Sequence, residues 1–533
     1  MSFVSDCEVF MFPIPSRTLP ASRPLLRNSL NLCVRSFVIY FLAAILLLAG
    51  CTGPSRLSMR KKGPGRTTVP SAWMFSASRY PALQRKIDLL LPDSLFPPSN
   101  LGIKIVSLSK RETLYELNPG MMFNPASNQK LFTAATALSE LGEGYRFATQ
   151  FSIDTTMSVK RLYVKGFGDP VLSTADLDSI ARNLSHILPA GKTWTLVGDT
   201  SFFDDLHWGL GWTWDDEPDP SAMFISPLSV NGNTITVNVQ PGRSHGDQVV
   251  VTTDPPTGFV AIENNGRTVA DSVTEELNIS RTRSSPQGLL NLIIIRGEVP
   301  RRDTTIKVML SLAHPELYTL TLLGERLQSH GVQFVGMSFD TIPAAARTIA
   351  RYEHRLDSVV TYMDKESDNL SAECILKTLG VKNAGTPGKA ATGVSLIMKF
   401  LSENGIDTTR IVIADGSGVS RYNLVSTALI IDLLTAIHKK GAHFATLYHS
   451  LPVAGIDGTL SRRMRGTPAQ GNLRAKTGTL NGTSSLSGYV HTADGELLAF
   501  SILMQHFPNN TRTYRQVQDR IGILLSGLRR SDM

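Results

Sequence analysis

Hydrophobic residues recur at helical spacing in several parts of the chain. The clearest case is 131–141, where apolar residues return every three or four positions and predict a helix. Asn124 and Pro125 are suited to the first positions of this helix, and Gly142 is suited to its end. Other segments with helical periodicity are 317–327, 369–379 and 392–401.

Short runs of β-branched and aromatic residues predict strands elsewhere. Between about 145 and 305 such runs are frequent and are broken by turn residues. They include 161–164, 234–239, 248–252 and 292–295. Near the C-terminus, 487–490 and 497–502 flank Asp494 and Gly495, which predicts a hairpin. Helices and strands are therefore expected in separate regions, as in an α+β protein.

Three short motifs carry the candidate chemistry. They are Ser127-Asn128-Gln129-Lys130, Ser367-Asp368-Asn369 and Lys476-Thr477-Gly478. In this order, S-x-x-K, S-x-N and K-T-G are typical of serine enzymes that recognise penicillin and use a serine nucleophile with a nearby lysine. Each motif is short, and matches to two of the three also occur elsewhere in the chain.

The local context distinguishes Ser127 from two other S-x-x-K matches. Ser58 lies in a basic stretch without an apolar pattern, and Ser107 lies in 102–108, which is expected to be a strand. Ser127 lies at the predicted start of a helix, where the helix dipole favours developing negative charge. Lys130, three residues later, shares its helix face. S-x-N also recurs, at Ser29 and Ser229, whereas Lys-Thr-Gly occurs once.

The N-terminal sequence predicts export. Residues 37–49 form an apolar run of 13 residues preceded by arginines, the size of a signal-peptide core and short for a membrane span. The run leads into Leu48-Ala49-Gly50-Cys51, which is typical of a bacterial lipoprotein signal. We therefore expect a signal peptide over 1–50 and a diacylated Cys51 on the periplasmic side of the cell envelope. An uncleaved membrane anchor is the alternative, and it gives nearly the same location.

The charge distribution agrees with a tether over residues 51–80. The chain has a formal net charge of +8 at pH 7, and removal of residues 1–50, with four arginines and two acids, leaves about +6. Five of these charges lie between residues 52 and 66. This basic tail is suited to an anionic lipid surface, and the charge pattern is no basis for nucleic-acid binding. After cleavage Cys374 is a lone thiol, so no disulfide framework is expected.

The spacing of the motifs indicates an insertion. Ser127 and Ser367 are 240 residues apart, whereas Ser367 and Lys476 are 109 apart. We expect an antiparallel sheet flanked by helices, as in serine β-lactamases and DD-peptidases, interrupted by a β-rich insertion of one or two subdomains. The expected boundaries are 81–150 and 346–533 for the two parts of the catalytic domain, and 151–345 for the insertion.

Longer blocks around the motifs extend the match. They are 415–424, 451–460 and 474–482, with 166–170 and 211–216 inside the insertion. With these blocks the sequence resembles the class C D-alanyl-D-alanine carboxypeptidases/endopeptidases, of the penicillin-binding protein 4 type, over roughly residues 80–530. The resemblance implies cleavage of peptidoglycan peptides that end in D-alanine, inhibition by β-lactam antibiotics, and extra domains after the S-x-x-K helix.

The resemblance also implies residue roles. Ser127 attacks the D-Ala–D-Ala carbonyl and forms an acyl-enzyme, Lys130 accepts the Ser127 proton, and Ser367 relays a proton to the leaving amine in a hydrogen-bond chain with Lys130. Asn369 holds the substrate amide, and the neighbouring cation Lys476 helps to lower the pKa of Lys130. The resemblance further implies that the substrate carboxylate is bound by Lys476, Thr477 and Thr479, with Gly478 in the same substrate-binding segment. It also implies that the N–H groups of Ser127 and Thr479 form the oxyanion hole.

Other interpretations stay open at this point. Arg421 is a candidate for contact with an acidic group of the peptide, although a plain ion pair is an equal alternative. No histidine or cysteine pattern indicates a metal site, and no cofactor is expected. A β-lactamase and a non-catalytic β-lactam- or peptidoglycan-binding lipoprotein are the competing functions. The sequence leaves the oligomeric state and the balance of carboxypeptidase and endopeptidase activity undetermined.

Overall fold

The computed structural model describes residues 79–533, apart from 92–98, 157–159, 190, 283–290 and 509. The predicted signal peptide, Cys51 and nearly all of the predicted tether lie outside the described residues. Among the helices that the structure does describe, none has the length and apolar character needed to cross a membrane.

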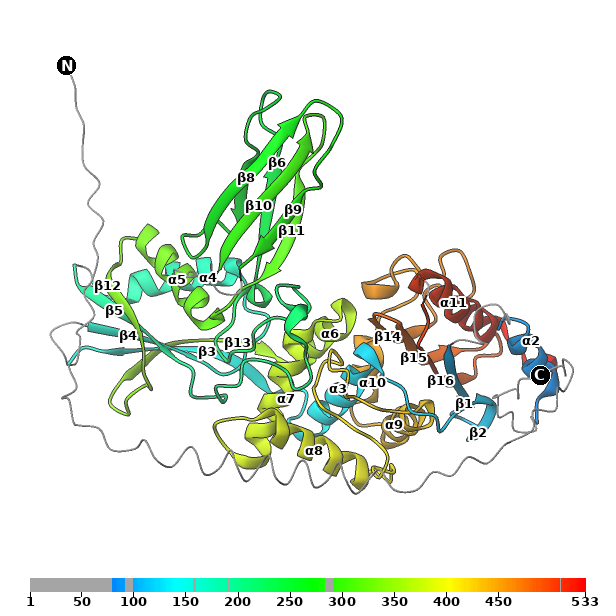
Figure 1. Cartoon of the computed structure of the whole chain (residues 1–533). Coiled ribbons are helices and arrows are strands. Elements are labelled where there is room, and N and C mark those ends of the chain that lie inside the picture. Colours follow the sequence, from blue (N-terminus) through cyan, green and yellow to red (C-terminus); the bar gives the residue numbers. More distant parts are fainter. Residues whose placement is uncertain (1–78, 92–98, 157–159, 190, 283–290, 509) are drawn as a thin grey trace, which may run out of the picture. The chain divides into compact units, whose positions relative to one another are not determined.

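A five-stranded antiparallel sheet forms the centre of the part that carries the C-terminal motif (Figure 1). Its strand order is β14-β15-β16-β1-β2. The strands are β1 (Asn100–Ser107), β2 (Glu112–Leu117), β14 (Arg474–Leu480), β15 (Thr483–His491) and β16 (Leu497–Gln505). The predicted hairpin is confirmed, since β15 pairs with β16 across the Asp494-Gly495 turn. Strand β14, which carries Lys476-Thr477-Gly478, pairs with β15.

Both faces of this sheet are covered by other elements, as the side chains of β16 show. Ala499 and Leu503 belong to one buried cluster, whereas Phe500 and Ile502 belong to another. Because side chains alternate between the two faces of a strand, a strand buried on both faces is apolar throughout. This explains why 497–502 is apolar at every position except Ser501. Helices α2 (Pro81–Asp88) and α11 (Thr511–Gly527) cover the second face.

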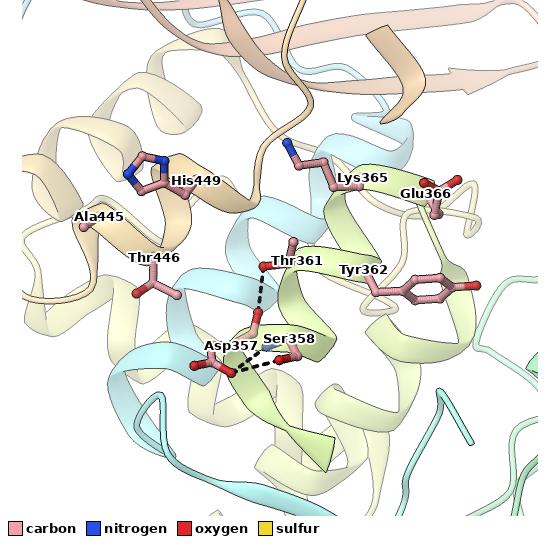
Figure 2. Close-up of a pocket in the computed structure, with 9 residues that line it drawn as sticks. All are labelled: Asp357, Ser358, Thr361, Tyr362, Lys365, Glu366, Ala445, Thr446 and His449. Carbon is pink, nitrogen blue, oxygen red and sulfur yellow. Dashed lines mark hydrogen bonds between the residues drawn. The ribbon is translucent and has the colours of Figure 1, made fainter. Parts of the chain in front are cut away.

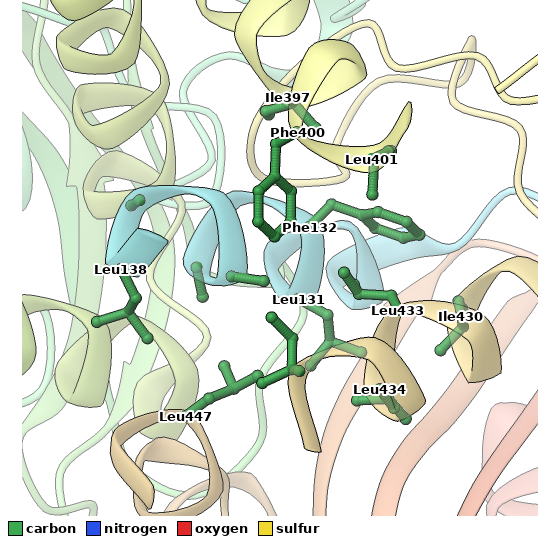
Figure 3. Close-up of a cluster of buried hydrophobic side chains, with 14 of the residues drawn as sticks. Leu131, Phe132, Leu138, Ile397, Phe400, Leu401, Ile430, Leu433, Leu434 and Leu447 are labelled. Carbon is green, nitrogen blue, oxygen red and sulfur yellow. The ribbon is translucent and has the colours of Figure 1, made fainter. Parts of the chain in front are cut away.

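The first face packs against a group of helices built around the S-x-x-K helix. Leu131, Phe132 and Leu138 of α3 (Gln129–Glu140) are fully or almost fully buried among apolar residues of the surrounding helices (Figure 3). These helices are α6 (Leu356–Glu366), α7 (Asn369–Ala384), α8 (Ala390–Glu403), α9 (Thr427–Lys440) and α10 (Phe444–Ser450). Helix α3 is therefore held on all sides, which fixes the position of its N-terminal residues.

The segment between the first two motifs forms three further sheets. A five-stranded sheet has the order β12-β5-β4-β3-β13, and two three-stranded sheets have the orders β8-β10-β9 and β11-β6-β7. The strands are β3 (Arg146–Asp154), β4 (Lys160–Gly166), β5 (Thr193–Asp199), β6 (Thr234–Gln240), β7 (Val250–Asp254), β8 (Ala261–Val269), β9 (Asn278–Arg281), β10 (Leu292–Pro300), β11 (Ile306–Ser311), β12 (Gln333–Phe339) and β13 (Arg347–Arg355). Helices α4 (Thr174–Ile187) and α5 (Pro315–Ser329) pack in the same core. The five-stranded sheet thus includes the first residues of β3 and all of β13, which lie outside the expected insertion of 151–345.

Buried contacts join this segment to the helices that carry the site. Lys377 of α7 forms an ion pair with Asp204 and is almost fully buried. Trp212 donates from its indole nitrogen to Asp415 over 2.9 Å, and apolar residues around Trp212 contact Leu370 and Cys374. Cys374 is buried, which raises the pKa of its thiol well above the usual value and suits a packing residue.

Candidate active site

The three motifs meet at one cavity of about 420 Å³. They arrive from three elements: the start of α3, the junction of α6 and α7, and strand β14. The lining residues are Ser127, Ser221, Ser367, Asn369, Thr459, Arg463, Thr477, Gly478, Thr479 and Arg515. Residues that are 349 positions apart in the sequence, Ser127 and Lys476, therefore belong to one site.

Ser127 is presented by a tight turn at the start of α3. A single 3₁₀ turn, η1 (Ala126–Asn128), leads into the helix, and the Ala126 N–H donates to Asn124 Oδ1 over 2.9 Å. Asn124 therefore holds the turn that precedes the helix, and its predicted place at the helix start is wrong, because α3 begins at Gln129 with Asn128 at its N-cap. Ala126 adopts a positive φ of 47°, which is unusual for a residue with a side chain. This backbone turn places Ser127, half-buried, at the positive end of the helix.

Lys130 is fully buried and surrounded by oxygen atoms. Its Nζ lies 3.1 Å from Ser127 Oγ, 2.7 Å from the Ser417 carbonyl oxygen, and within hydrogen-bonding distance of Asn369 Oδ1. A neutral amine has two N–H donors and one lone pair. The carbonyl oxygens of Ser417 and Asn369 take the two donors, which leaves the lone pair for the Ser127 hydroxyl proton.

Burial also lowers the pKa of Lys130, to about 8. Removal of the ammonium group from water is the largest cause, and nearby carboxylates such as Asp415 oppose it. The expected help from Lys476 is therefore not the leading cause. At neutral pH a useful fraction of Lys130 is uncharged, and this is what a general base requires.

Ser367 occupies a strained junction between two helices. It ends α6 in the left-handed conformation, with φ 60° and ψ 34°, and Asp368 then caps α7 by accepting the Ser371 N–H over 2.7 Å. Ser367 Oγ accepts a hydrogen bond from Lys476 Nζ at 2.9 Å. The resemblance implied a hydrogen-bond chain between Ser367 and Lys130, whereas the structure pairs Ser367 with Lys476.

Lys476 is also fully buried, and its pKa is lowered by burial first and by Lys130 second. Two buried lysines close enough to interact cannot both hold protons easily. Asp364, buried on α6 with its Oδ2 accepting from Ser450, favours the charged form of Lys476. We therefore expect one proton between Lys130 and Lys476 to be readily lost.

Gly478 allows β14 to approach the nucleophile. A side chain built on Gly478 would place its Cβ 2.1 Å from Ser485 Oγ, 2.8 Å from the Pro125 carbonyl oxygen and 2.9 Å from the Ser127 nitrogen. Only glycine fits, because real Cβ atoms do not come this close to other atoms. Thr479, the next residue on β14, lines the same cavity as Ser127.

The Asn369 amide is bonded at both ends. Its Oδ1 accepts from Lys130, and its Nδ2 donates to the Ser221 carbonyl oxygen over 2.7 Å. Ser221 belongs to the segment inserted between the first two motifs. The insertion therefore contributes one wall of the cavity, and the sequence patterns around Ser221 did not indicate this.

Asp415 organises the loop that follows α8 and is almost completely buried. Its carboxylate accepts hydrogen bonds from Trp212, Ser417, Gly418, Ser420 and Asn423. Glu373 accepts the N–H groups of Gly416 and Ser417 from the other side, and burial raises its pKa to about 8. These bonds hold the Ser417 carbonyl oxygen against Lys130.

The cavity also includes residues that the motifs did not indicate. Thr477 Oγ1 donates to Thr459 Oγ1 over 2.8 Å, and Arg515 donates to Thr479 Oγ1 over 2.8 Å. Thr459 falls in the 451–460 block, so the sequence held a signal for it, whereas Arg515 stands alone on α11. Arg421 lies apart from the lining residues, exposed, with its guanidinium donating to the Asn481 carbonyl oxygen.

A second cavity, of about 680 Å³, lies between α6 and α10 (Figure 2). Its wall contains none of the residues from the three motifs. Tyr362 of α6 and His449 of α10 are among its lining residues, and Lys365 is held by an ion pair with Asp457. The wide opening and absence of the nucleophile distinguish this cavity from the one at Ser127.

A nucleophile at a helix N-terminus, a buried lysine of lowered pKa beside it, and a K-T-G strand across the cavity define a penicillin-recognising serine enzyme. Residues 83–526 match the family model of the D-Ala-D-Ala carboxypeptidase 3 (S13) family. The chain belongs to this family and is a serine-type D-Ala-D-Ala carboxypeptidase, which confirms the predicted class and activity.

Relatives cover most of the chain. It is 34% identical over 449 residues to a D-alanyl-D-alanine carboxypeptidase of Actinomadura sp. (strain R39). This match covers 80% of this chain and 82% of that protein. It is 25% identical over 420 residues to the D-alanyl-D-alanine carboxypeptidase DacB of Haemophilus influenzae, over 75% of this chain and 84% of that protein.

The fold is shared with a solved structure. The crystal structure of penicillin binding protein 4 from Haemophilus influenzae superimposes with a TM-score of 0.72, at 23% identity, over 83% of this chain and 99% of that chain. This similarity confirms the predicted α+β fold with an interrupted catalytic domain.

Proposed function

We propose that Ser127 is the nucleophile, Lys130 its general base and Ser367 the proton relay in the cleavage of peptidoglycan stem peptides or cross-links. The observation that carries this proposal is the position of Lys130 Nζ, 3.1 Å from Ser127 Oγ, with its other two hydrogen bonds directed to carbonyl oxygens. This arrangement leaves a lone pair aimed at the nucleophile.

The reaction then proceeds in two steps. Ser127 Oγ attacks the carbonyl carbon of the D-Ala–D-Ala bond while its proton passes to Lys130, and the oxyanion is held by the N–H groups of Ser127 and Thr479. The leaving amine takes a proton from Ser367, which Lys476 resupplies across their 2.9 Å contact. Water hydrolyses the acyl-enzyme. A β-lactam acylates Ser127 in the same way, with Asn369 contacting its amide side chain.

Replacement of Ser367 by glycine tests the relay. Glycine adopts the left-handed conformation of residue 367 without strain, so the variant loses the hydroxymethyl side chain and keeps the backbone turn. We expect kcat/KM to fall by about 10²-fold, the lower end of what acid–base catalysis contributes. Steady-state release of D-alanine from a synthetic peptide measures this change.

Ser395→Ala is the control for this experiment. Ser395 lies on the exposed face of α8 and bonds only its own helix, at the Ala391 carbonyl oxygen. Its activity should equal that of the wild type. Wild-type activity in a folded Ser367→Gly protein would remove Ser367 from the mechanism.

We further propose that the protein acts on the periplasmic side of the cell envelope, anchored through a lipid on Cys51. The support is the sequence alone: an apolar run of 13 residues, the Leu-Ala-Gly-Cys motif and the basic segment after it. A tether places the active site next to its polymeric substrate. A basic segment next to the acyl chains adds attraction to anionic lipids.

Cys51→Ser tests the anchor. The hydroxyl cannot receive the thioether-linked lipid, so we expect the protein to move from the membrane fraction to the soluble fraction of lysed cells. Immunoblotting of the two fractions measures this change, with Cys7→Ser as the matched control. Retention of Cys51→Ser in the membrane would favour the uncleaved anchor over the lipoprotein.

A further inference from the structure

The cations that line the active-site cavity lie outside all three motifs. Lys130 and Lys476 are fully buried behind the wall and direct their amines to Ser127 and Ser367. Among the described residues that line the cavity, the positive charges belong to Arg463 and Arg515. A carboxylate entering this cavity therefore meets guanidinium groups first.

The two arginines differ in their partners. Arg463 donates from Nε and Nη2 to Asp519, at 2.8 and 2.7 Å, and from Nη2 to Gln518 Oε1 at 3.2 Å. Arg515 forms no salt bridge with any acid in the described part of the chain. Its guanidinium donates from Nη2 to Thr479 Oγ1 over 2.8 Å. Arg463 is thus neutralised, whereas Arg515 keeps its charge available.

The surroundings of Arg515 favour an anion. Partial burial lowers the pKa of Arg515 first and the Arg463 guanidinium lowers it second, whereas Asp519 opposes them. A guanidinium has five N–H donors in a planar fork that fits a carboxylate. One nitrogen is used by Thr479, and the hydroxyl of that same residue faces the cavity beside Gly478.

We propose that Arg515 is a specificity-determining residue that binds the carboxylate group on the carbon next to the scissile nitrogen of the substrate. The proposal rests on the acyl-transfer function of Ser127. The ligand chemistry is a free α-carboxylate on the leaving group, held jointly by Arg515 and the Thr479 hydroxyl. A peptide whose terminal carboxylate is replaced by a carboxamide lacks the charge that Arg515 pairs with. Arg515 therefore does not increase kcat/KM for that peptide.

The test compares two substrates in two variants. The substrates are an N-acylated tripeptide ending in D-Ala–D-Ala with a free carboxylate and the same peptide with a C-terminal carboxamide. For Arg515→Gln we expect kcat/KM on the carboxylate substrate to fall by about 10- to 100-fold, the range for a hydrogen-bonded charge. On the carboxamide substrate it should stay within about threefold, because no charge pair is lost there.

Arg512→Gln is the matched control, since Arg512 is exposed on the same helix and lies outside the cavity wall. It should leave both substrates unchanged. Arg515→Lys keeps the charge without the fork and should fall between the wild type and Arg515→Gln. Arg515 is itself exposed, so these variants are expected to fold.

The outcomes separate the two proposals. An equal loss on both substrates would mean that Arg515 only supports Thr479 structurally, and it would overturn the specificity role. An unchanged preference for the carboxylate in Arg515→Gln would overturn it as well. If instead the wild type cleaved neither peptide and Ser127 took no acyl group, the acyl-transfer function itself would fail.

Discussion

Replacement of Ser127 by alanine is expected to abolish peptide cleavage and covalent labelling by penicillin together. The alanine side chain carries no oxygen to attack the carbonyl group, and no acyl-enzyme can form. Loss of a serine nucleophile lowers turnover by roughly 10⁴-fold or more in enzymes where it has been measured. Release of D-alanine and binding of a fluorescent penicillin, followed on denaturing gels, measure the two effects.

The chain offers a matched control for the nucleophile. Ser58 begins another S-x-x-K sequence, in the stretch without an apolar pattern, so Ser58→Ala removes a serine of the same motif. This variant should label and cleave as the wild type does. Labelling that persists in Ser127→Ala, at the wild-type rate, would place the nucleophile elsewhere and contradict the assignment.

The pH dependence of acylation is expected to report Lys130. Only the neutral amine can take the Ser127 proton, and burial lowers the pKa of Lys130 to about 8. The neutral fraction grows as the pH rises, so the acylation rate should increase about tenfold per pH unit below pH 8 and level off above it. Stopped-flow measurement of penicillin acylation between pH 6 and 9 gives this profile.

Lys130→Met removes both the base and the titration. The rate should drop by up to about 10⁴-fold, the upper range for acid–base catalysis, and the residual rate should lack the step near pH 8. Lys110→Met, at the exposed lysine of the Ser107 match, should preserve both the rate and the step. A wild-type rate that falls with rising pH across this range would rule out Lys130 as the base.

The buried charges of the site have a cost for stability. Lys130, Lys476, Asp364 and Glu373 are all almost completely excluded from water, and each has a pKa shifted toward its neutral form by burial. Such shifts mean that the charged forms are less stable in the folded protein than in the unfolded chain. The surrounding hydrogen bonds, such as those that Asp415 accepts, offset part of this loss of stability.

The sequence by itself determined the elements and the chemistry. The 3.6-residue period over 131–141 identifies a helix, because this period is set by which side chains must face a core. The two strand-like runs on either side of Asp494 and Gly495 identify a hairpin. The three motifs identified Ser127, Lys130, Ser367 and Lys476 as candidates, since their residue types and order restrict the reaction class. The 240-residue gap between Ser127 and Ser367 predicted an inserted segment, because a compact catalytic domain does not need so many residues between two parts of its active site.

Only the tertiary structure decided which residues complete the site. Ser221 and Arg515 reach the cavity from the insertion and from α11, far from every motif, and neither has a local pattern that marks it. The leading cause of the Lys130 pKa shift is burial by neighbouring elements, a property that no spacing in the sequence contains. Helical and strand periods depend on neighbours a few residues away. Desolvation and the pairing of charges depend on residues brought together by packing across hundreds of positions, and these only the folded chain specifies.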